Sequence, residues 1–211
     1  MIVTNTCIYN FNNGYIDEEA LAKCAEMIRN GGLVAFPTET VYGLGCNAFD
    51  ELAVQNLYKA KMRPPVKPIS LCVPNLSVAE SVAFFSPKAK VLFETFMPGP
   101  LTLVLPKRSC VPDIVTAGLD SVGIRVPSNK IALRLAELCG VPIALPSANL
   151  SGQGALTEGT AVFGALTGRI DAVIDGGKTE VGQESTILSL VEEPKIIRQG
   201  ALSFDLLKPY L

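Results

Sequence analysis

Short apolar runs alternate with helix-like segments along almost the whole chain, and this alternation constrains the fold more than any other feature. Asp17 can cap a first helix with one apolar face, and Gly31 can end it just before the apolar run 33–36. We expect further helices from Asp50 to residue 60, from Ser86 to residue 96, from Ser128 to residue 139 and from Thr157 to residue 166. The remaining apolar runs predict strands at 69–73, 101–105, 122–126, 141–145, 172–174, 186–191 and 196–197.

The order of these segments indicates the class of fold. Helices and strands interleave at first, and strands crowd together towards the end of the chain. This order predicts an α/β fold with a mixed, twisted sheet covered by helices, rather than a purely parallel sheet. The chain has 211 residues and is 48% hydrophobic, so we expect a single domain over residues 1–211.

The chain shows no signal for a membrane or for export. No apolar run approaches the length of a membrane span, and residues 1–19 have neither a basic start nor a long apolar stretch. The six cysteines form no CxxC pair, which argues against a zinc or redox motif. Free cysteines within apolar runs fit a reducing compartment, so we expect the protein in the cytoplasm and away from membranes.

The sequence contains no histidine. This excludes a Ser-His-Asp or Cys-His nucleophile system within the chain, and it removes a common metal ligand. Chemistry must then rest on positioning, cations, hydroxyl groups, backbone amides or a basic substrate. The net charge of −2 means that any nucleic-acid contact must come from a local patch. One such patch, without any acidic residue, lies between Glu51 and Glu80 and holds Lys59, Lys61, Arg63 and Lys67.

Residues 36–45 carry the first candidate site. The apolar run stops at Pro37, which cannot donate to a sheet, and Thr38, Glu39 and Thr40 follow at once. A strand end that opens into polar side chains and glycines is where α/β proteins bind ligands. An ordinary strand-to-helix connection is the alternative for this loop taken alone.

Two cations, Lys61 and Arg63, lie where the second predicted helix ends before Pro64. A lysine point charge and an arginine fork together suit a polyphosphate, and we expect both at the surface. A solvated helix end is the alternative. Arg125 lies inside an apolar strand, so it needs an anionic partner, either an internal carboxylate or the carboxylate of a ligand.

Five more polar residues stand beside apolar runs. Ser121 precedes a strand and can donate to a phosphate or close a turn. Ser147 and Asn149 follow a strand, and their side chains and free backbone N–H groups can cradle phosphate, although the loop lacks the P-loop lysine and can be a plain turn. Ser185 begins a strand and Arg198 ends one, and either can be structural.

Together, these segments resemble the YrdC-like family of L-threonylcarbamoyladenylate synthases from about residue 31 to residue 201. The resemblance is carried, in order, by residues 32–45, 61–64, 98–102, 116–125, 146–149, 175–177, 184–186 and 198–200. It implies an open, twisted, mixed α/β sheet with flanking helices and a large concave face. It also implies a nucleotidyltransferase that converts L-threonine, bicarbonate and ATP to threonylcarbamoyl-AMP and pyrophosphate.

The resemblance also implies roles for single residues. Lys61 and Arg63 would be catalytic, holding the ATP phosphates and neutralising the leaving pyrophosphate. The residues expected to contact ATP with them are Ser121, Ser147, Asn149 and Arg198. Those expected to bind L-threonine are Thr38, Ser185 and, through its carboxylate, Arg125. A Mg²⁺ ion would be held mainly by the ATP phosphates, with no metal ligands from the protein.

The implied partners are ATP, L-threonine, bicarbonate and the downstream proteins that transfer the threonylcarbamoyl group to tRNA, and an RNA contact is also expected. Some relatives have a histidine near the threonine where this chain has Cys72, which weakens that contact. The longer members carry an extra C-terminal domain, so we expect the short, single-domain form.

Two alternatives remain open. One is a paralogue of the same fold that binds RNA or nucleotide without synthase activity. The other is a carbamoyl-transfer module like those in larger hydrogenase-maturation proteins. The sequence assigns no role to Glu39, which can orient a hydroxyl group, assist Mg²⁺ or cap a helix.

Overall fold

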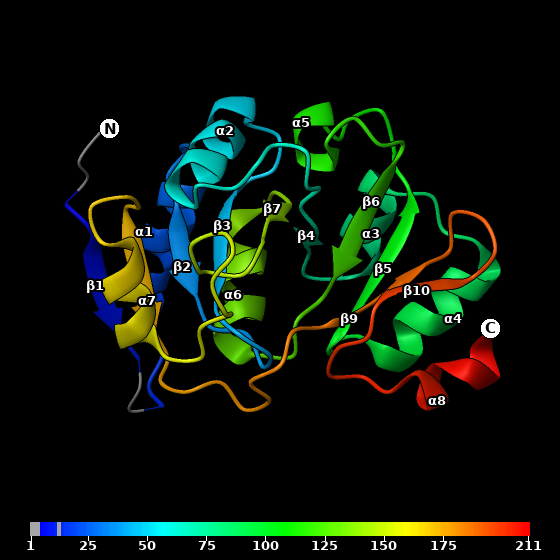
Figure 1. Cartoon of the computed structure of the whole chain (residues 1–211). Helices are drawn as coiled ribbons and strands as arrows, with labels where there is room; N and C mark the ends of the chain where they lie inside the picture. Colours follow the sequence, from blue (N-terminus) through cyan, green and yellow to red (C-terminus); the bar gives the residue numbers. More distant parts are fainter. Residues whose placement is uncertain (1–4, 12–13) are drawn as a thin grey trace.

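The structure is a computed structural model that describes residues 5–11 and 14–211. Within these residues the strands form a ten-stranded sheet in the order β1-β8-β2-β3-β7-β4-β6-β5-β9-β10 (Figure 1). The strands are β1 (Cys7–Asn10), β2 (Val34–Phe36), β3 (Gly43–Asn47), β4 (Leu71–Cys72), β5 (Leu101–Pro106), β6 (Ser121–Arg125), β7 (Ile143–Ala144), β8 (Ala172–Asp175), β9 (Thr186–Ser189) and β10 (Lys195–Arg198). The helices are α1 (Glu18–Arg29), α2 (Glu51–Ala60), α3 (Leu76–Val82), α4 (Pro87–Phe96), α5 (Asp113–Thr116), α6 (Lys130–Cys139), α7 (Gly159–Leu166), α8 (Phe204–Leu207) and a final 3-10 turn, η1 (Lys208–Tyr210).

The sheet is mixed, as predicted. Strands β1, β8 and β2 run parallel, whereas β3 and β7 pair antiparallel with their neighbours. Further along, β4 is parallel to β6 and β5 is parallel to β9, while β6–β5 and β9–β10 are antiparallel pairs. The predicted α/β sheet with flanking helices is therefore confirmed.

Apolar side chains cover both faces of the sheet, and β2 shows how. Val34 and Phe36 join a core cluster with Leu21 of α1 and Leu135 of α6, whereas Ala35 between them belongs to a second cluster. That second cluster extends under α2, α4 and α7. Because successive side chains of a strand point to opposite faces, one short strand contributes to both cores.

Most predicted helix starts are confirmed by their caps. Asp17, Asp50 and Ser86 each accept hydrogen bonds from the first-turn N–H groups of α1, α2 and α4. Two predicted caps are wrong by one residue, because Asn129, not Ser128, caps α6, and Glu158, not Thr157, precedes α7. The side chain of Asn129 takes the N–H groups of the first turn, whereas α7 has no side-chain cap among the described residues.

The second half of the predicted loop 36–45 is a strand instead. Gly43 and Gly45 begin β3, which pairs with β2. A Cβ atom at Gly43 would lie 2.5 Å from Cδ1 of Leu145, and one at Gly45 would lie 2.7 Å from Cε1 of Phe36. Glycine therefore lets a strand form here against neighbouring side chains, and this requirement comes from residues distant in sequence.

The other differences concern short elements. The apolar runs at 69–73 and 141–145 contain only two-residue strands, β4 and β7. The sequence did not predict β1, α3, α5, α8 or η1, which are short and lack a strong period. None of the helices that the structure describes is long and apolar enough to cross a membrane.

Candidate active site

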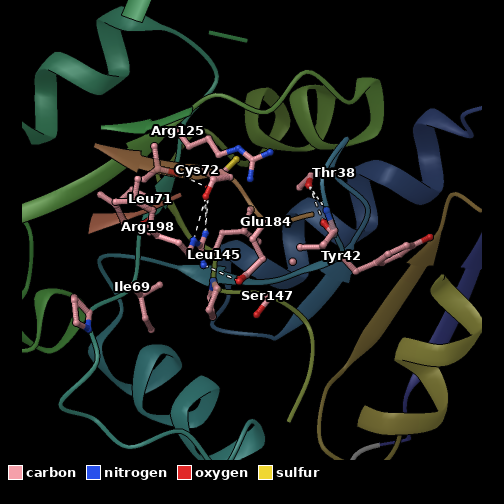
Figure 2. Close-up of a pocket in the computed structure, with 18 of the residues that line it drawn as sticks. Thr38, Tyr42, Ile69, Leu71, Cys72, Arg125, Leu145, Ser147, Glu184 and Arg198 are labelled. Atoms are coloured by element: carbon pink, nitrogen blue, oxygen red, sulfur yellow. Dashed lines mark hydrogen bonds and ion pairs between the residues drawn. The ribbon is translucent and has the colours of Figure 1, made fainter. Parts of the chain in front are cut away.

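The polar segments that the sequence singles out meet at one pocket (Figure 2). The pocket lies where β2 and β6 end, beside β4, and where the chain leaves β7 and enters β9. Six of the nine predicted site residues line it: Thr38, Arg63, Arg125, Ser147, Ser185 and Arg198. The three others, Lys61, Ser121 and Asn149, lie beside it rather than in its wall.

Thr38 builds the turn that follows β2. Its hydroxyl group donates to the carbonyl oxygen of Val41 at 2.7 Å and accepts from the N–H groups of Thr40 and Val41 at 3.2 and 3.3 Å. Thr40 Oγ1 lies 2.8 Å from Thr38 Oγ1. The hydroxyl group of Thr38 is thus largely occupied within its own turn, although the residue lines the pocket.

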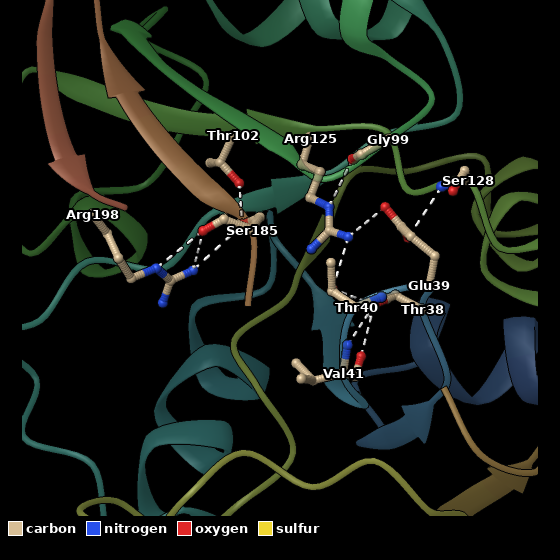
Figure 3. A network of polar contacts seen from close by, with 10 residues as sticks. All are labelled: Thr38, Glu39, Thr40, Val41, Gly99, Thr102, Arg125, Ser128, Ser185 and Arg198. Carbon is tan, nitrogen blue, oxygen red and sulfur yellow. Dashed lines mark hydrogen bonds and ion pairs between the residues drawn. The ribbon is translucent and has the colours of Figure 1, made fainter. Parts of the chain in front are cut away.

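Arg125 is held by several groups at the end of β6 (Figure 3). Its Nη2 donates to Oε1 of Glu39 at 2.8 Å and to Oγ1 of Thr40 at 2.9 Å, and its Nε donates to the carbonyl oxygen of Gly99 at 3.2 Å. Nη1 makes no hydrogen bond or ion pair with any residue that the structure describes. The internal salt bridge that the sequence offered as one alternative is therefore present, and one nitrogen remains for a ligand.

A second polar network lies on the other side of the pocket. Arg198 donates from Nε and Nη2 to the carbonyl oxygen of Ser185 at 3.1 and 3.0 Å, and its Nη1 lies 2.8 Å from Oε2 of Glu184. The hydroxyl groups of Ser185 and Thr102 are 2.8 Å apart. These contacts tie the end of β10 to the start of β9, so Ser185 and Arg198 act as one unit.

Lys61 is buried, not exposed as the sequence predicted. Only 1% of the residue is accessible, because its side chain runs from the end of α2 under the loop that follows β7. There the ammonium group donates to the carbonyl oxygens of Ser147 and Asn149. Burial and the nearby charge of Arg63 lower the pKa of Lys61 to about 8, and Glu184 opposes this shift.

Arg63 follows Lys61 in the chain but reaches the pocket. Met62 between them has a φ of 52°, a left-handed conformation that turns the chain. Arg63 then donates from Nη2 to the carbonyl oxygen of Pro68 at 3.0 Å and remains half-buried. The two cations therefore differ in position, one beneath the pocket and one in its wall.

Asn149 is turned into its own loop. Its amide nitrogen donates to the carbonyl oxygens of Leu150 and Gln153 at 2.9 and 2.7 Å. Its Oδ1 is buried and has no hydrogen-bond partner in the described structure. Asn149 and Lys61 together fix the loop that presents Ser147.

Ser121 lies in an adjoining pocket, which shares Pro68, Ile69, Ser70 and Ile187 with the first. The adjoining pocket is lined by the exposed apolar side chains of Leu119, Val191 and Ile197. The two pockets thus form one continuous region with a polar end and a more apolar end.

Several residues of the site were not assigned from sequence. Glu39, Thr40, Thr102 and Glu184 are polar residues that contact partners further along the chain. Thr102 carried a local signal, because it is the one polar side chain in the apolar run 101–105. Cys72 lines the pocket beside Arg125, with which it is paired across β4 and β6. Burial raises the pKa of the Cys72 thiol to about 12, so this thiol is neutral at neutral pH.

The chain is similar to known proteins over most of its length. The profile of the Sua5/YciO/YrdC family, described as "Telomere recombination", matches residues 26–200. The chain is 46% identical over 192 residues to a threonylcarbamoyl-AMP synthase of Pyrococcus abyssi (strain GE5 / Orsay), which covers 90% of this chain and 56% of that protein. It is 37% identical over 193 residues to a putative threonylcarbamoyl-AMP synthase of Methanocaldococcus jannaschii, which covers 89% of this chain and 90% of that protein.

A solved structure agrees with these relatives. The crystal structure of P. abyssi Sua5 complexed with L-threonine superposes with a TM-score of 0.94 at 44% identity, covering 98% of this chain and 61% of that chain. The chain therefore belongs to the Sua5/YciO/YrdC family, as its motifs predicted. It spans little more than half the length of the P. abyssi synthase.

Proposed function

We propose that this protein is a threonylcarbamoyl-AMP synthase that joins L-threonine, bicarbonate and ATP and releases pyrophosphate. The observation that carries the proposal is the single pocket in which Arg125, with one unused nitrogen, faces hydroxyl groups and the cations Arg63 and Arg198. One guanidinium suits an amino-acid carboxylate, and the cations around it suit phosphates. The relatives named threonylcarbamoyl-AMP synthase, and the P. abyssi Sua5 structure complexed with L-threonine, support this function.

The threonine end of the site is assigned to Arg125, Thr38 and Ser185. Arg125 would receive the substrate carboxylate on the side of its guanidinium that Glu39 does not use. Ser185, held by Thr102 and Arg198, would contact the amino acid from the opposite wall. Thr38 would contribute mainly by shaping the turn, because its hydroxyl group already bonds within it.

The ATP end is assigned to Arg63, Arg198 and the loop at Ser147. Arg63 and Arg198 would bind the phosphates directly, since both line the pocket. Lys61 would act from beneath the loop, adding positive charge while it and Asn149 hold the loop in place. Ser121 and the apolar wall of the adjoining pocket would receive the nucleoside.

The reaction needs no nucleophile from the protein. The amine of threonine adds to bicarbonate with loss of water and gives a carbamate. A carbamate oxygen then forms a bond to the α-phosphorus of ATP, the bond to the β-phosphate oxygen breaks, and pyrophosphate leaves. The protein aligns the two substrates and neutralises the charge that develops on the phosphates, which agrees with a chain that lacks histidine.

We propose that Mg²⁺ enters with ATP. Among the residues that the structure describes, no group of three or more acidic or cysteine side chains could hold a metal ion. Glu184 lines the pocket but is paired with Arg198, so the phosphates would supply most ligands. Bound Mg²⁺ would neutralise phosphate charge during the transfer.

The product would be used to modify tRNA. Threonylcarbamoyl-AMP is a mixed anhydride, so a transfer protein must consume it, and its acceptor would be the adenosine beside the anticodon. An RNA contact would use the exposed cations Lys59 and Lys67 of the basic segment between Glu51 and Glu80. The free thiols of all six cysteines fit a reducing cytoplasm as the compartment.

Product analysis tests the proposal. Purified protein is incubated with ATP, Mg²⁺, L-threonine and ¹³C-bicarbonate. The nucleotides are then separated, and their masses are measured by mass spectrometry. We expect threonylcarbamoyl-AMP that carries the ¹³C label. ATP binding without any such product would instead favour the paralogue that binds nucleotide or RNA and has no synthase activity.

A further inference from the structure

Glu39 is a buried acidic residue beside the pocket, and its carboxylate is bonded to protein groups (Figure 3). Its Oε1 accepts from Arg125, and its Oε2 accepts from the backbone N–H of Ser128 at 3.1 Å. Its carbonyl oxygen accepts from the N–H of Val181 at 2.9 Å. The carboxylate is thus fixed by a hydrogen bond to each oxygen, and the residue is also held by its backbone.

The contacts of Arg125 fix the orientation of its guanidinium group. A guanidinium is planar, so the bonds from Nε to Gly99 and from Nη2 to Glu39 fix both its position and the direction of Nη1. Thr40 adds a second acceptor for Nη2. Of these three partners, only Glu39 carries a charge that opposes the charge of Arg125.

We propose that Glu39 is a positioning residue, whose carboxylate orients the guanidinium of Arg125 so that Nη1 points at the substrate carboxylate. This inference rests on the proposed function, in which Arg125 binds threonine. A substrate carboxylate must meet the guanidinium along its plane to form strong hydrogen bonds. A guanidinium that rotates about Nε would lose this alignment even though its charge remained.

The test compares Glu39→Gln with Arg125→Ala. Glu39→Gln keeps the size of the side chain but removes its charge and one acceptor oxygen. We expect the KM for L-threonine to rise at least tenfold, while the KM for ATP changes less than twofold. In an Arg125→Ala background, Glu39→Gln should have no further effect on threonine, because the two residues act through one contact.

A carboxylate outside the pocket provides the matched control. Glu80 forms an ion pair with Lys90 at 2.6 Å, and neither residue lines the pocket. Glu80→Gln should leave the KM for threonine within twofold. Glu39→Asp is the second variant, since it keeps the charge beside Arg125 but shortens the side chain. It should still raise the KM for threonine, and it remains informative if Glu39→Gln does not fold.

The outcomes separate this inference from the proposed function. If Arg125→Ala leaves the threonine KM unchanged, the proposed carboxylate contact is wrong, whatever Glu39 does. If Arg125→Ala raises the threonine KM but the folded Glu39 variants do not, only the positioning role is overturned. Equal rises in the KM values for threonine and ATP in the Glu39 variants would also overturn it, because a general structural role would affect both substrates.

Discussion

The ammonium group of Lys61 donates a hydrogen bond to the carbonyl oxygen of Ser147, and so ties the end of α2 to the loop that follows β7. This bond places a buried cation directly beneath the wall that we assign to the ATP phosphates. Because Lys61 is buried, its protonation state depends on pH in a range that experiments can reach.

The value of kcat/KM for ATP should fall as the pH rises through about 8. The pKa of Lys61 is lowered to about 8 in the ligand-free protein, and kcat/KM reports the protonation state of the free enzyme. Loss of the ammonium charge weakens phosphate binding. A profile of kcat/KM for ATP from pH 6 to 10 tests this, and a flat profile across pH 8 would contradict it.

The same lowered pKa predicts how stability depends on pH. Between the folded pKa of about 8 and the unfolded value of 10.5, the unfolded chain binds more protons at Lys61. The free energy of unfolding should therefore gain roughly 3 kcal/mol from this residue as the pH rises through that interval. Urea unfolding of the wild type and Lys61→Met measures the difference, which is absent if the lysine has an ordinary pKa.

Arg63→Ala should reduce activity without unfolding the protein. Arg63 lines the pocket and is half-buried, so its loss removes the proposed phosphate contact but little packing. We expect kcat/KM for ATP to fall about a hundredfold and the free energy of unfolding to change by less than about 1 kcal/mol. Lys67→Ala is the control, because it removes an exposed cation of the same patch. Equal losses of activity in both variants would argue for a general charge effect.

Gly200→Ala should disturb the network of Ser185 and Arg198. A Cβ atom at Gly200 would overlap the carbonyl oxygens of Glu184 and Ser185, which are backbone atoms and cannot easily move. We expect a loss of about 1–3 kcal/mol in the free energy of unfolding, together with lower activity. Gly154→Ala is the matched control, since a Cβ atom there meets nothing within 4 Å. Similar stability of both variants would contradict the close packing.

The cysteines should divide into two classes of reactivity. Cys7 and Cys110 are exposed, whereas Cys24, Cys46, Cys72 and Cys139 are buried, and burial raises the pKa of each buried thiol. Alkylation requires the thiolate, so the folded protein should be modified rapidly at two positions and slowly at the others. Peptide mapping after a short treatment with iodoacetamide at pH 8 distinguishes the classes. Rapid labelling of Cys72 would show that the pocket wall opens.

Local signals made much of the fold predictable. Asp17, Asp50 and Ser86 begin helices because their side chains bond to the next turn, a requirement contained within a few residues. Strand β3 was not predicted, because glycines usually weaken a strand. Here Gly43 and Gly45 are required, since the side chains of Leu145 and Phe36 leave no room for a Cβ atom.

The candidate site was likewise predictable from local signals but not from contacts between distant residues. The sequence identified Arg125 as a cation in need of a partner, but its partner Glu39 is 86 residues away and no local pattern connects them. It likewise placed Lys61 at the surface, because the carbonyl oxygens that bury its ammonium group belong to a distant loop. The motifs therefore located the pocket, while the structure supplied the contacts that orient its side chains.

Pyrophosphate release provides a direct test of the proposed synthase function. Purified protein is supplied with ATP, Mg²⁺ and bicarbonate, and pyrophosphate is measured with and without L-threonine. We expect rapid release that requires threonine and is lost in Arg125→Ala at low threonine concentration. Release that is the same with and without threonine would contradict the synthase function.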